Sequence, residues 1–189
     1  ALIAYQTAWL KAHYPAAYMA AVLSSDMDNT DKVVLFVEEC KYLNLHIAPP
    51  DINTSDYMFK VKDEKNLIYG LGAVKGAGQA AIELIVAARQ QNGVFKDLFD
   101  FVKRFDSRKL NRRVLESLIK AGALDSLNKP RGLLFNNIDA AIKLAEQQQQ
   151  FKKQRSLFDE EDVFCYHDSE PQWSFLKKLH GEKEVLGIF

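Results

Sequence analysis

The apolar residues of this chain recur mostly at helical spacing. Residues 2–24 are rich in apolar side chains, and Pro15 divides them into two predicted helices because proline suits a first helical turn. Residues 31–44 place apolar side chains at i, i+3, i+4 and i+7, and either Asn29 or Thr30 is suited to cap that helix. The first part of the chain is therefore predicted to be helical.

A strand-like stretch then interrupts the helical pattern. Two prolines within residues 48–51 break the preceding helix, and residues 57–61 and 67–70 flank a charged turn at residues 62–66. This arrangement predicts a short β-hairpin. Helical periodicity returns after it, in short pieces joined by tight turns.

The last third of the chain is predicted to be helical and then irregular. Residues 138–153 show a polar helical pattern that runs into four glutamines, a composition typical of a helix end or a linker. Residues 159–172 are acidic and lack periodicity, which predicts a loop, and residues 173–179 predict a short helix.

Two glycines precede one predicted helix in a way that suits phosphate binding. The sequence Val74-Lys75-Gly76-Ala77-Gly78 is followed by helical periodicity over residues 79–91. Glycine permits positive φ and close approach of another backbone, and the first N–H groups of a helix have no partner within it. With the helix dipole and the charge of Lys75, they predict a site for a phosphate oxygen. The order of residues, with Ala81 following, is that of a helix-hairpin-helix motif; a plain helix–helix turn with a glycine cap is the alternative.

A second unit of the same kind is predicted downstream. Residues 99–105 predict a short helix and residues 109–121 a longer one, joined by a turn at residues 106–107. Cations in the first turns of a helix oppose its dipole, and a fold tolerates them more readily if an anion lies in front of them. We therefore expect a second set of phosphate contacts from Ser107, Arg108, Lys109, Arg112 and Arg113. The buried stripe of the longer helix is predicted to be Leu110, Val114, Leu115, Leu118 and Ile119.

The predicted fold is thus mainly α, a short-helix array with tandem helix-hairpin-helix units and a small β-hairpin. The net charge of the chain is zero, but it is unevenly spread. Residues 103–131 carry nine Lys or Arg against three Asp or Glu, and residues 155–170 carry one against six. The basic block favours a polyanionic partner, while a solvated helix face is the other interpretation.

Composition narrows the class of protein further. With 48% hydrophobic residues the chain can bury a core, and no apolar run approaches the roughly 20 residues of a membrane span. Cys40, Cys165 and the four histidines form no zinc pattern, so no metal site is predicted and a reducing, cytoplasmic location is expected. The start at Ala1 and the apolar run at residues 185–189 suggest a fragment of a longer protein.

Several stretches together resemble one protein family. They are YQTAWLKAHYP at residues 5–15, PPDIN at 49–53, GLGAVKG at 70–76, KLNRR at 109–113 and GEKEVLG at 181–187. By these stretches, which span essentially the whole chain, it resembles the alpha subunits of bacterial DNA polymerase III, the replicative polymerases of family C.

The resemblance implies a division into four parts. Residues 1–66 would be the C-terminal part of the fingers, 67–150 the helix-hairpin-helix domain that binds duplex DNA, 151–172 the clamp-binding motif with an acidic loop, and 173–189 the approach to an OB domain. It also implies that DNA-directed DNA polymerase activity, with paired aspartates holding Mg²⁺ in a palm, belongs to a longer protein. A D-x-D at residues 26–28 stands at a helix cap, where acidic residues are ordinary, so no catalytic residue or cofactor is expected in this chain.

The same resemblance implies a protein partner. Gln154-Arg155-Ser156-Leu157-Phe158 is similar to the pentapeptide that docks on the sliding clamp, the beta subunit. Leu157 and Phe158 are adjacent apolar side chains that could fill a pocket on the clamp, and Gln154 could hydrogen-bond the pocket rim; alternatively, the two apolar side chains pack in this domain's own core. The expected partners are duplex DNA, bound by its backbone without sequence specificity, the clamp and the other polymerase III holoenzyme subunits, with no membrane.

Two other functions are compatible with parts of the pattern. A helix-hairpin-helix DNA glycosylase often carries an iron–sulfur cluster held by four cysteines, whereas this chain has two and lacks a clear catalytic Lys or Asp after the hairpin. A helical interaction scaffold without DNA contact would use the glycines only as caps. The salt dependence of duplex binding separates the DNA-binding function from the scaffold.

Overall fold

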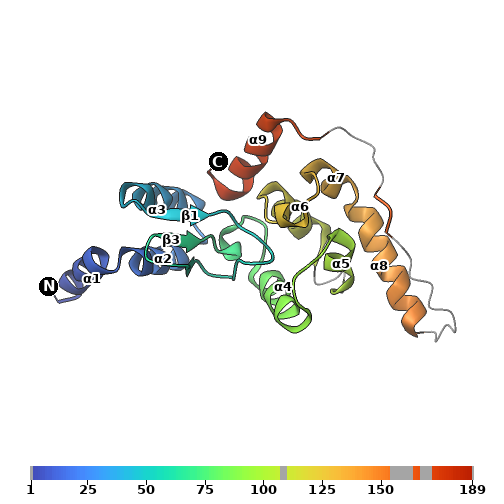
Figure 1. Cartoon of the computed structure of the whole chain (residues 1–189), viewed down its shortest axis with the longest axis horizontal. Coiled ribbons are helices and arrows are strands. Elements are labelled where there is room, and N and C mark those ends of the chain that lie inside the picture. The colour runs from blue at the N-terminus through green and yellow to red at the C-terminus, as the bar shows by residue number, and fades with distance from the viewer. Residues whose placement is uncertain (1, 107–109, 154–163, 167–171, 189) are drawn as a thin grey trace.

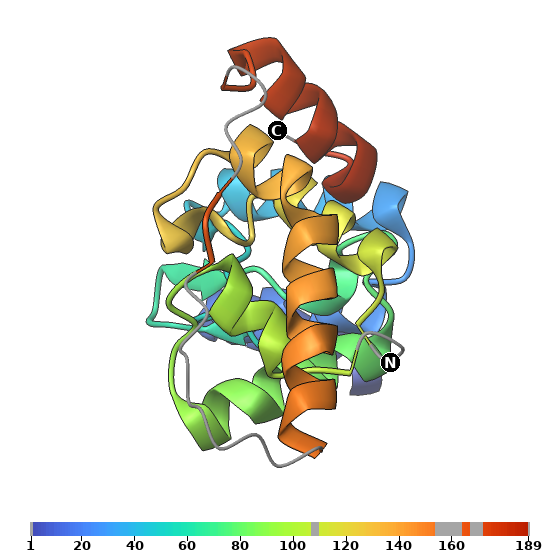
Figure 2. The same cartoon turned by 90° about the vertical axis from the view of Figure 1, so that its right-hand side faces the viewer.

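The computed structural model describes residues 2–106, 110–153, 164–166 and 172–188. The first three helices and a small sheet lie at one end of the molecule, and the other helices extend from there to the opposite end (Figure 1). Seen along the long axis, α8 (Ile138–Lys153) runs beside α5 (Leu98–Lys103) (Figure 2). This mainly helical architecture confirms the predicted fold class.

The first three helices form close to their predicted bounds. Pro15 begins α2 (Pro15–Ser25) directly after α1 (Leu2–His13), as proline in a first turn should. In α3 (Thr30–Tyr42) the cap is Asn29, whose side chain accepts a hydrogen bond from the backbone N–H of Lys32 at 3.2 Å. The capping prediction is therefore confirmed.

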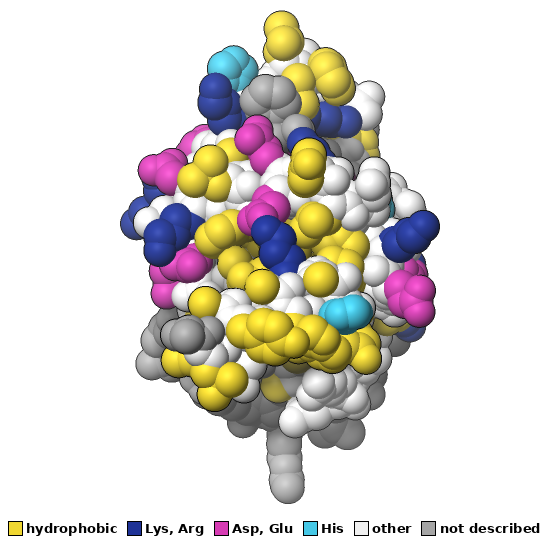
Figure 3. Space-filling model, turned by 90° about the vertical axis from the view of Figure 1, so that its left-hand side faces the viewer, with side chains coloured by type: hydrophobic (Ala, Val, Ile, Leu, Met, Phe, Trp, Pro, Cys, Tyr) yellow, Lys and Arg dark blue, Asp and Glu magenta, His cyan; other side chains and the backbone are white. Residues whose placement is uncertain are grey.

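The helix α1 packs against α2 but has no buried residue. Figure 3 views this end of the molecule and shows apolar side chains gathered on it. The large exposed apolar residues of α1 are Leu2, Ile3, Tyr5, Trp9 and Leu10.

The predicted β-hairpin is present, but it belongs to a larger sheet. β2 (Lys60–Val61) pairs antiparallel with β3 (Asn66–Ile68), which confirms the hairpin with shorter strands. No pattern in the sequence predicted β1 (His46–Ala48), which pairs in parallel with β3, so that the strand order is β1-β3-β2. Three residues are too few to show alternation, and a parallel pair has no turn between its strands to mark it.

The glycine hairpin and the second unit follow the sheet. The short 3₁₀ helix η1 (Leu71–Ala73) leads to α4 (Gln79–Asn92), and α5 is followed by α6 (Arg112–Lys120). α6 begins later than residue 109, because the Asn111 side chain accepts a hydrogen bond from the N–H of Val114 at 3.1 Å and so caps the helix there. The predicted buried stripe is confirmed, since each of its members is at most 6% exposed.

The last described helix differs from its prediction. The 3₁₀ turn η2 (Asp125–Leu127) is followed by α7 (Arg131–Asn136), α8 and finally α9 (Phe175–Leu186). The helix α9 ends at Leu186, well beyond the end predicted at residue 179. Gly181 weakens the helical pattern in sequence, but it lets α9 approach α6, where an added Cβ would lie 3.4 Å from the Cβ of Lys120.

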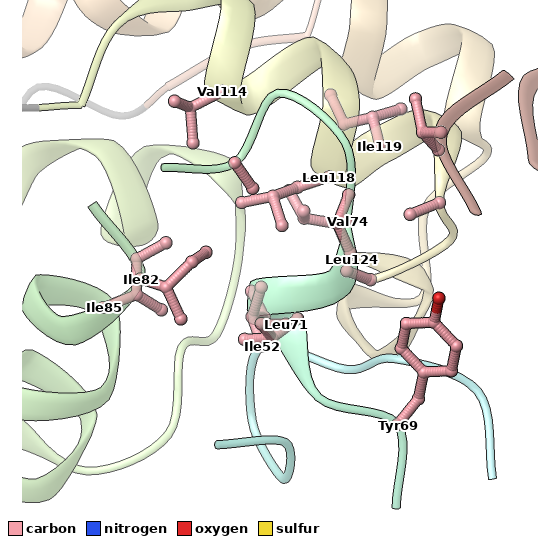
Figure 4. Packing of buried hydrophobic residues seen from close by; sticks show 14 of the residues in the cluster. Ile52, Tyr69, Leu71, Val74, Ile82, Ile85, Val114, Leu118, Ile119 and Leu124 are labelled. Atoms are coloured by element: carbon pink, nitrogen blue, oxygen red, sulfur yellow. The ribbon is translucent and has the colours of Figure 1, made fainter. Parts of the chain in front are cut away.

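One hydrophobic core joins the sheet, η1 and the helices α4 and α6 (Figure 4). Ile52, Leu71, Ile82 and Leu118 come from four separate segments, and none of them is exposed to solvent. The segments that flank the glycine hairpin are therefore packed in the core. No helix in the described part of the chain is long and apolar enough to span a membrane.

Candidate functional site

The glycine hairpin is a tight turn whose shape depends on Gly76. The N–H of Ala77 donates to the carbonyl of Val74 at 3.0 Å, which closes a four-residue turn. Gly76, the third residue of the turn, has a φ of +90°. Turns of type II require positive φ at that position, and glycine adopts it without steric cost. The prediction of a glycine-dependent turn is consistent with this geometry.

The start of α4 is open toward solvent. Gly78 is the N-cap, so no side chain satisfies the first N–H groups of the helix. An added Cβ at Gly78 would meet no atom within 4 Å, and Gln79 and Ala80 are exposed. Unpartnered N–H groups at the positive end of a helix dipole form a favourable site for an anion.

The helix α6 lies beside the hairpin. An added Cβ at Gly76 would stand 2.7 Å from the hydroxyl oxygen of Ser117, so the two segments are in close contact. Together they line a cleft of about 700 Å³. The cleft wall from the second unit is Asn111, Arg113 and Val114, so the N-termini of α4 and α6 open on the same space.

The structure brings together some of the predicted DNA-binding residues and separates others. Lys75 and Arg113 are exposed and line the cleft. Gly76, Ala77 and Gly78 line it too, and Ala77 is buried. Arg112 points elsewhere: its guanidinium forms ion pairs with Glu116 and with Asp139 of α8. These two hydrogen-bonding partners raise the pKa of Arg112.

The other predicted site residues lie outside the described part of the chain. These are Ser107, Arg108 and Lys109 in the second unit, and Gln154, Ser156, Leu157 and Phe158 in the clamp-binding motif. Their predicted roles stay predictions.

A third wall of the cleft was not predicted from the sequence. It comes from the turn between α2 and α3 and from the first residue of α3, where Met27, Asp28 and Thr30 line the cleft. Asp28 was noted only as part of a helix cap, because no periodicity or motif indicates that it faces a loop almost fifty residues later. It places a carboxylate in a cleft whose other charged described residues are Lys75 and Arg113.

The chemistry of this arrangement is that of anion binding. Two cations, two helix N-termini and glycine backbone can receive phosphate oxygens, while Asp28 opposes them. Among the described residues, no group of three or more His, Cys, Asp or Glu side chains could hold a metal ion.

Comparison with known proteins shows a motif family and several similar polymerase subunits. A family model for the helix-hairpin-helix motif matches residues 44–134. The DNA polymerase III subunit alpha of Vibrio cholerae is 46% identical over 196 residues, that of Escherichia coli K12 is 46% identical over 200, and that of Neisseria meningitidis serogroup B is 47% identical over 192. Each match covers 100% of this chain and 17% of the relative, so the chain spans about a sixth of the length of these proteins.

Proposed function

Because this chain is homologous along its whole length to a segment of the DNA polymerase III alpha subunits, we propose that it holds the phosphate backbone of duplex DNA during chromosomal replication. The observation that carries the proposal is the shared cleft. The hairpin at residues 75–78 and the start of α6 present two helix N-termini, Lys75 and Arg113 to one space.

Phosphate contacts of this kind would hold DNA without reading its sequence. Backbone N–H groups and cationic side chains contact phosphate oxygens, which are the same at every base pair. Non-specific binding has dissociation constants of about 10⁻⁴ to 10⁻⁶ M at physiological salt. The logarithm of its binding constant falls linearly with the logarithm of the salt concentration. We therefore expect weak, salt-sensitive and sequence-independent duplex binding.

A titration with a mixed-sequence duplex at about 50 mM and about 200 mM salt tests the proposal. Lys75→Ala and Arg113→Ala should each lower the salt slope by about one, because each removes one phosphate contact. Lys143→Ala is the matched control, since Lys143 is exposed on α8 and does not line the cleft.

Arg112→Ala should change the salt slope less than either substitution in the cleft, because its guanidinium is occupied by Glu116 and Asp139. Binding that is flat across salt, or absent at low salt, would show that the cleft does not hold DNA.

We propose that nucleotide transfer is performed by the longer protein to which such a segment belongs, with Mg²⁺ held in its palm. The support is the match to polymerase subunits. The 189-residue chain should bind duplex DNA yet extend no primer in the presence of Mg²⁺ and nucleotides. Primer extension by this chain alone would overturn the assignment.

We also propose that Gln154–Phe158 docks on the sliding clamp, in the cytoplasm and alongside the other holoenzyme subunits. The support is the similarity of this pentapeptide to clamp-binding motifs. Changing Leu157 and Phe158 to Ala should abolish retention on immobilised clamp, because the pair would fill the clamp's pocket. Phe175 and Leu176, an adjacent apolar pair that is 74% and 68% exposed, serve as the control pair. Equal retention of the Leu157/Phe158 variant and the unchanged chain would rule the docking out.

A further inference from the structure

Charged side chains hold the helix α9 against α6 and α7. Glu184 accepts a hydrogen bond from the ammonium group of Lys120 at 2.8 Å, and Glu182 accepts one from the guanidinium of Arg131 at 2.7 Å. Arg131 is only 11% exposed, so its pair with Glu182 is better shielded from water than the pair made by Glu184, which is 61% exposed. The axis of α9 is therefore set by α6 and α7.

The last turn of α9 reaches the glycine hairpin. The carbonyl of Val185 accepts a hydrogen bond from the backbone N–H of Lys75 at 2.9 Å. The last carbonyls of a helix have no partner within it, and here one of them is satisfied by the residue that precedes Gly76. Val185 is 3% exposed, so this hydrogen bond lies in a largely dry environment.

On its other side the same turn presses against α3. Gly187 ends α9 with a φ of +76°, and its N–H donates to the carbonyl of Lys183 at 3.0 Å. An added Cβ would lie 2.6 Å from the Cγ2 of Thr30 and 2.9 Å from the Cγ2 of Val34. Thr30 itself lines the cleft. The end of α9 is thus fitted between α3 and the hairpin with no room for a methyl group.

The hairpin is consequently held from two sides. Ser117 of α6 lies against Gly76, and the carbonyl of Val185 in α9 accepts a hydrogen bond from the N–H of Lys75. Within the turn itself one hydrogen bond, from Ala77 to Val74, closes the loop. A shift of the end of α9 would therefore move the backbone of Lys75 and change where its neighbours present their N–H groups.

We propose that the last turn of α9, residues 185–187, is a positioning element that holds the glycine hairpin in the conformation that receives a phosphate. This proposal rests on the proposed duplex binding. It assigns Val185 and Gly187 a role in DNA binding although neither residue lines the cleft. The positioning element acts through hairpin geometry and adds no charge to the site.

Gly187→Ala tests the proposal in the 189-residue chain. The added methyl should push α9 away from Thr30 and weaken duplex binding by about tenfold, the equivalent of one net hydrogen bond. The salt slope should stay unchanged because no charge is removed, in contrast to Lys75→Ala. Gly93→Ala is the matched control, because Gly93 also ends a helix at positive φ, +75°, but an added Cβ there meets nothing within 4 Å.

A second variant keeps the test independent of backbone strain. Glu182→Gln loosens the pair with Arg131 and also removes a negative charge from the protein. Charge alone would strengthen DNA binding, whereas loss of positioning weakens it, so the two explanations predict opposite signs. We expect weaker binding, and stronger or equal binding would overturn the proposal.

Amide hydrogen exchange at Lys75 distinguishes the positioning role of residues 185–187 from the proposed DNA binding by the cleft. Its N–H should be protected in the unchanged chain and in Gly93→Ala, and it should exchange faster in Gly187→Ala because its acceptor has moved. If Gly187→Ala binds DNA normally while Lys75→Ala does not, the positioning role is wrong and the DNA-binding cleft stands. If the unchanged chain binds no duplex, the proposed function fails, and equal Lys75 exchange in the two glycine variants would still overturn the positioning role.

Discussion

Among single residues, Tyr69 is unusual because its buried hydroxyl has no hydrogen-bond partner in the described structure. The residue is 2% exposed, and burial raises the pKa of its hydroxyl. Its ring packs against Phe59, with ring centroids 4.7 Å apart, so the side chain contributes to the core through the ring alone. An unpaired buried hydroxyl costs free energy, because it gives up hydrogen bonds to water without replacing them.

Tyr69→Phe should therefore leave the free energy of unfolding unchanged or raise it by up to about 1 kcal/mol. Urea denaturation followed by far-ultraviolet circular dichroism measures the change. Tyr69→Leu, which removes the ring pair with Phe59, should instead lower stability. A loss of stability in Tyr69→Phe would indicate that the hydroxyl does have a partner.

The Asp100 carboxylate makes stability depend on pH. Burial alone would raise its pKa, but hydrogen bonds from the Arg104 guanidinium at 2.7 Å and from the N–H of Lys96 at 3.1 Å outweigh burial and lower it. Because the folded pKa lies below the unfolded value of about 3.9, the carboxylate stabilises the fold above that value. This contribution is lost as the pH falls through the lowered folded pKa.

Asp100→Asn should therefore destabilise the chain at pH 7 and reduce the loss of stability on acidification below about pH 4. Urea midpoints measured at a series of pH values give both effects. Glu146→Gln, an exposed substitution on α8, is the control. An acid limb with the same slope in Asp100→Asn and in the unchanged chain would contradict the assignment.

At the scale of elements, the two hairpin glycines have separate reasons to be glycine. Gly76 has positive φ and stands where a Cβ would contact Ser117. Gly78 has an ordinary φ of −65°, and an added Cβ would meet nothing within 4 Å. The first glycine serves the fold, whereas the second leaves space in the cleft.

Gly76→Ala should lower the free energy of unfolding by about 1 to 2 kcal/mol, through backbone strain and displacement of Ser117. Gly78→Ala should cost less than about 1 kcal/mol, since alanine is only a poorer helix cap. It should nevertheless weaken duplex binding, because its methyl group occupies the space that a phosphate would enter. Thermal unfolding and duplex titration of both variants measure the two effects, and unaltered DNA binding by Gly78→Ala would place the phosphate elsewhere.

Elements with a long amphipathic pattern could be predicted from the sequence, and elements defined by distant contacts could not. The buried stripe of α6 and the Asn29 cap depend on residues close together in sequence, so the residue pattern at 29–42 and 110–119 was enough to predict these helices. β1 exists because it pairs with a strand twenty residues later. The length of α9 depends on the approach of Gly181 to Lys120, which no local pattern reveals.

The candidate site divides in the same way. The turn at Gly76 and the exposed start of α4 follow from local residue types, and both were predicted. The pair of Arg112 with Asp139 and the presence of Asp28 in the cleft depend on tertiary packing, because Asp139 and Lys75 are far from them in sequence. A count of charges along the chain therefore located the basic block but not the side chains that remain available for DNA.

At the scale of the whole molecule, much of the basic block is neutralised internally. Arg104 pairs with Asp100, Arg112 with Glu116 and Asp139, and Arg131 with Asp125 and Glu182. In the chain as a whole, Lys and Arg equal Asp and Glu in number, 25 of each. The proposed attraction to DNA would therefore be a local property of the cleft rather than of the net charge.

Asp28→Asn should strengthen duplex binding several-fold at low salt, since it removes the carboxylate that opposes phosphate in the cleft. Asp31→Asn, three residues along and outside the cleft lining, controls for the change in net charge. The difference between the two variants should shrink as salt rises. Equal strengthening by both would mean that net charge, rather than the carboxylate in the cleft, limits binding.

The small number of charges among the described residues of the cleft would affect how long DNA stays bound. With Lys75, Arg113 and the opposing Asp28 as its charged described residues, the cleft would release a duplex quickly. A weak contact becomes useful when a tether keeps the two partners together, because intramolecular rebinding then acts at an effective concentration in the millimolar range. Fast release with immediate rebinding would let a duplex advance past the hairpin, so the same weakness that limits affinity in isolation would allow movement along DNA.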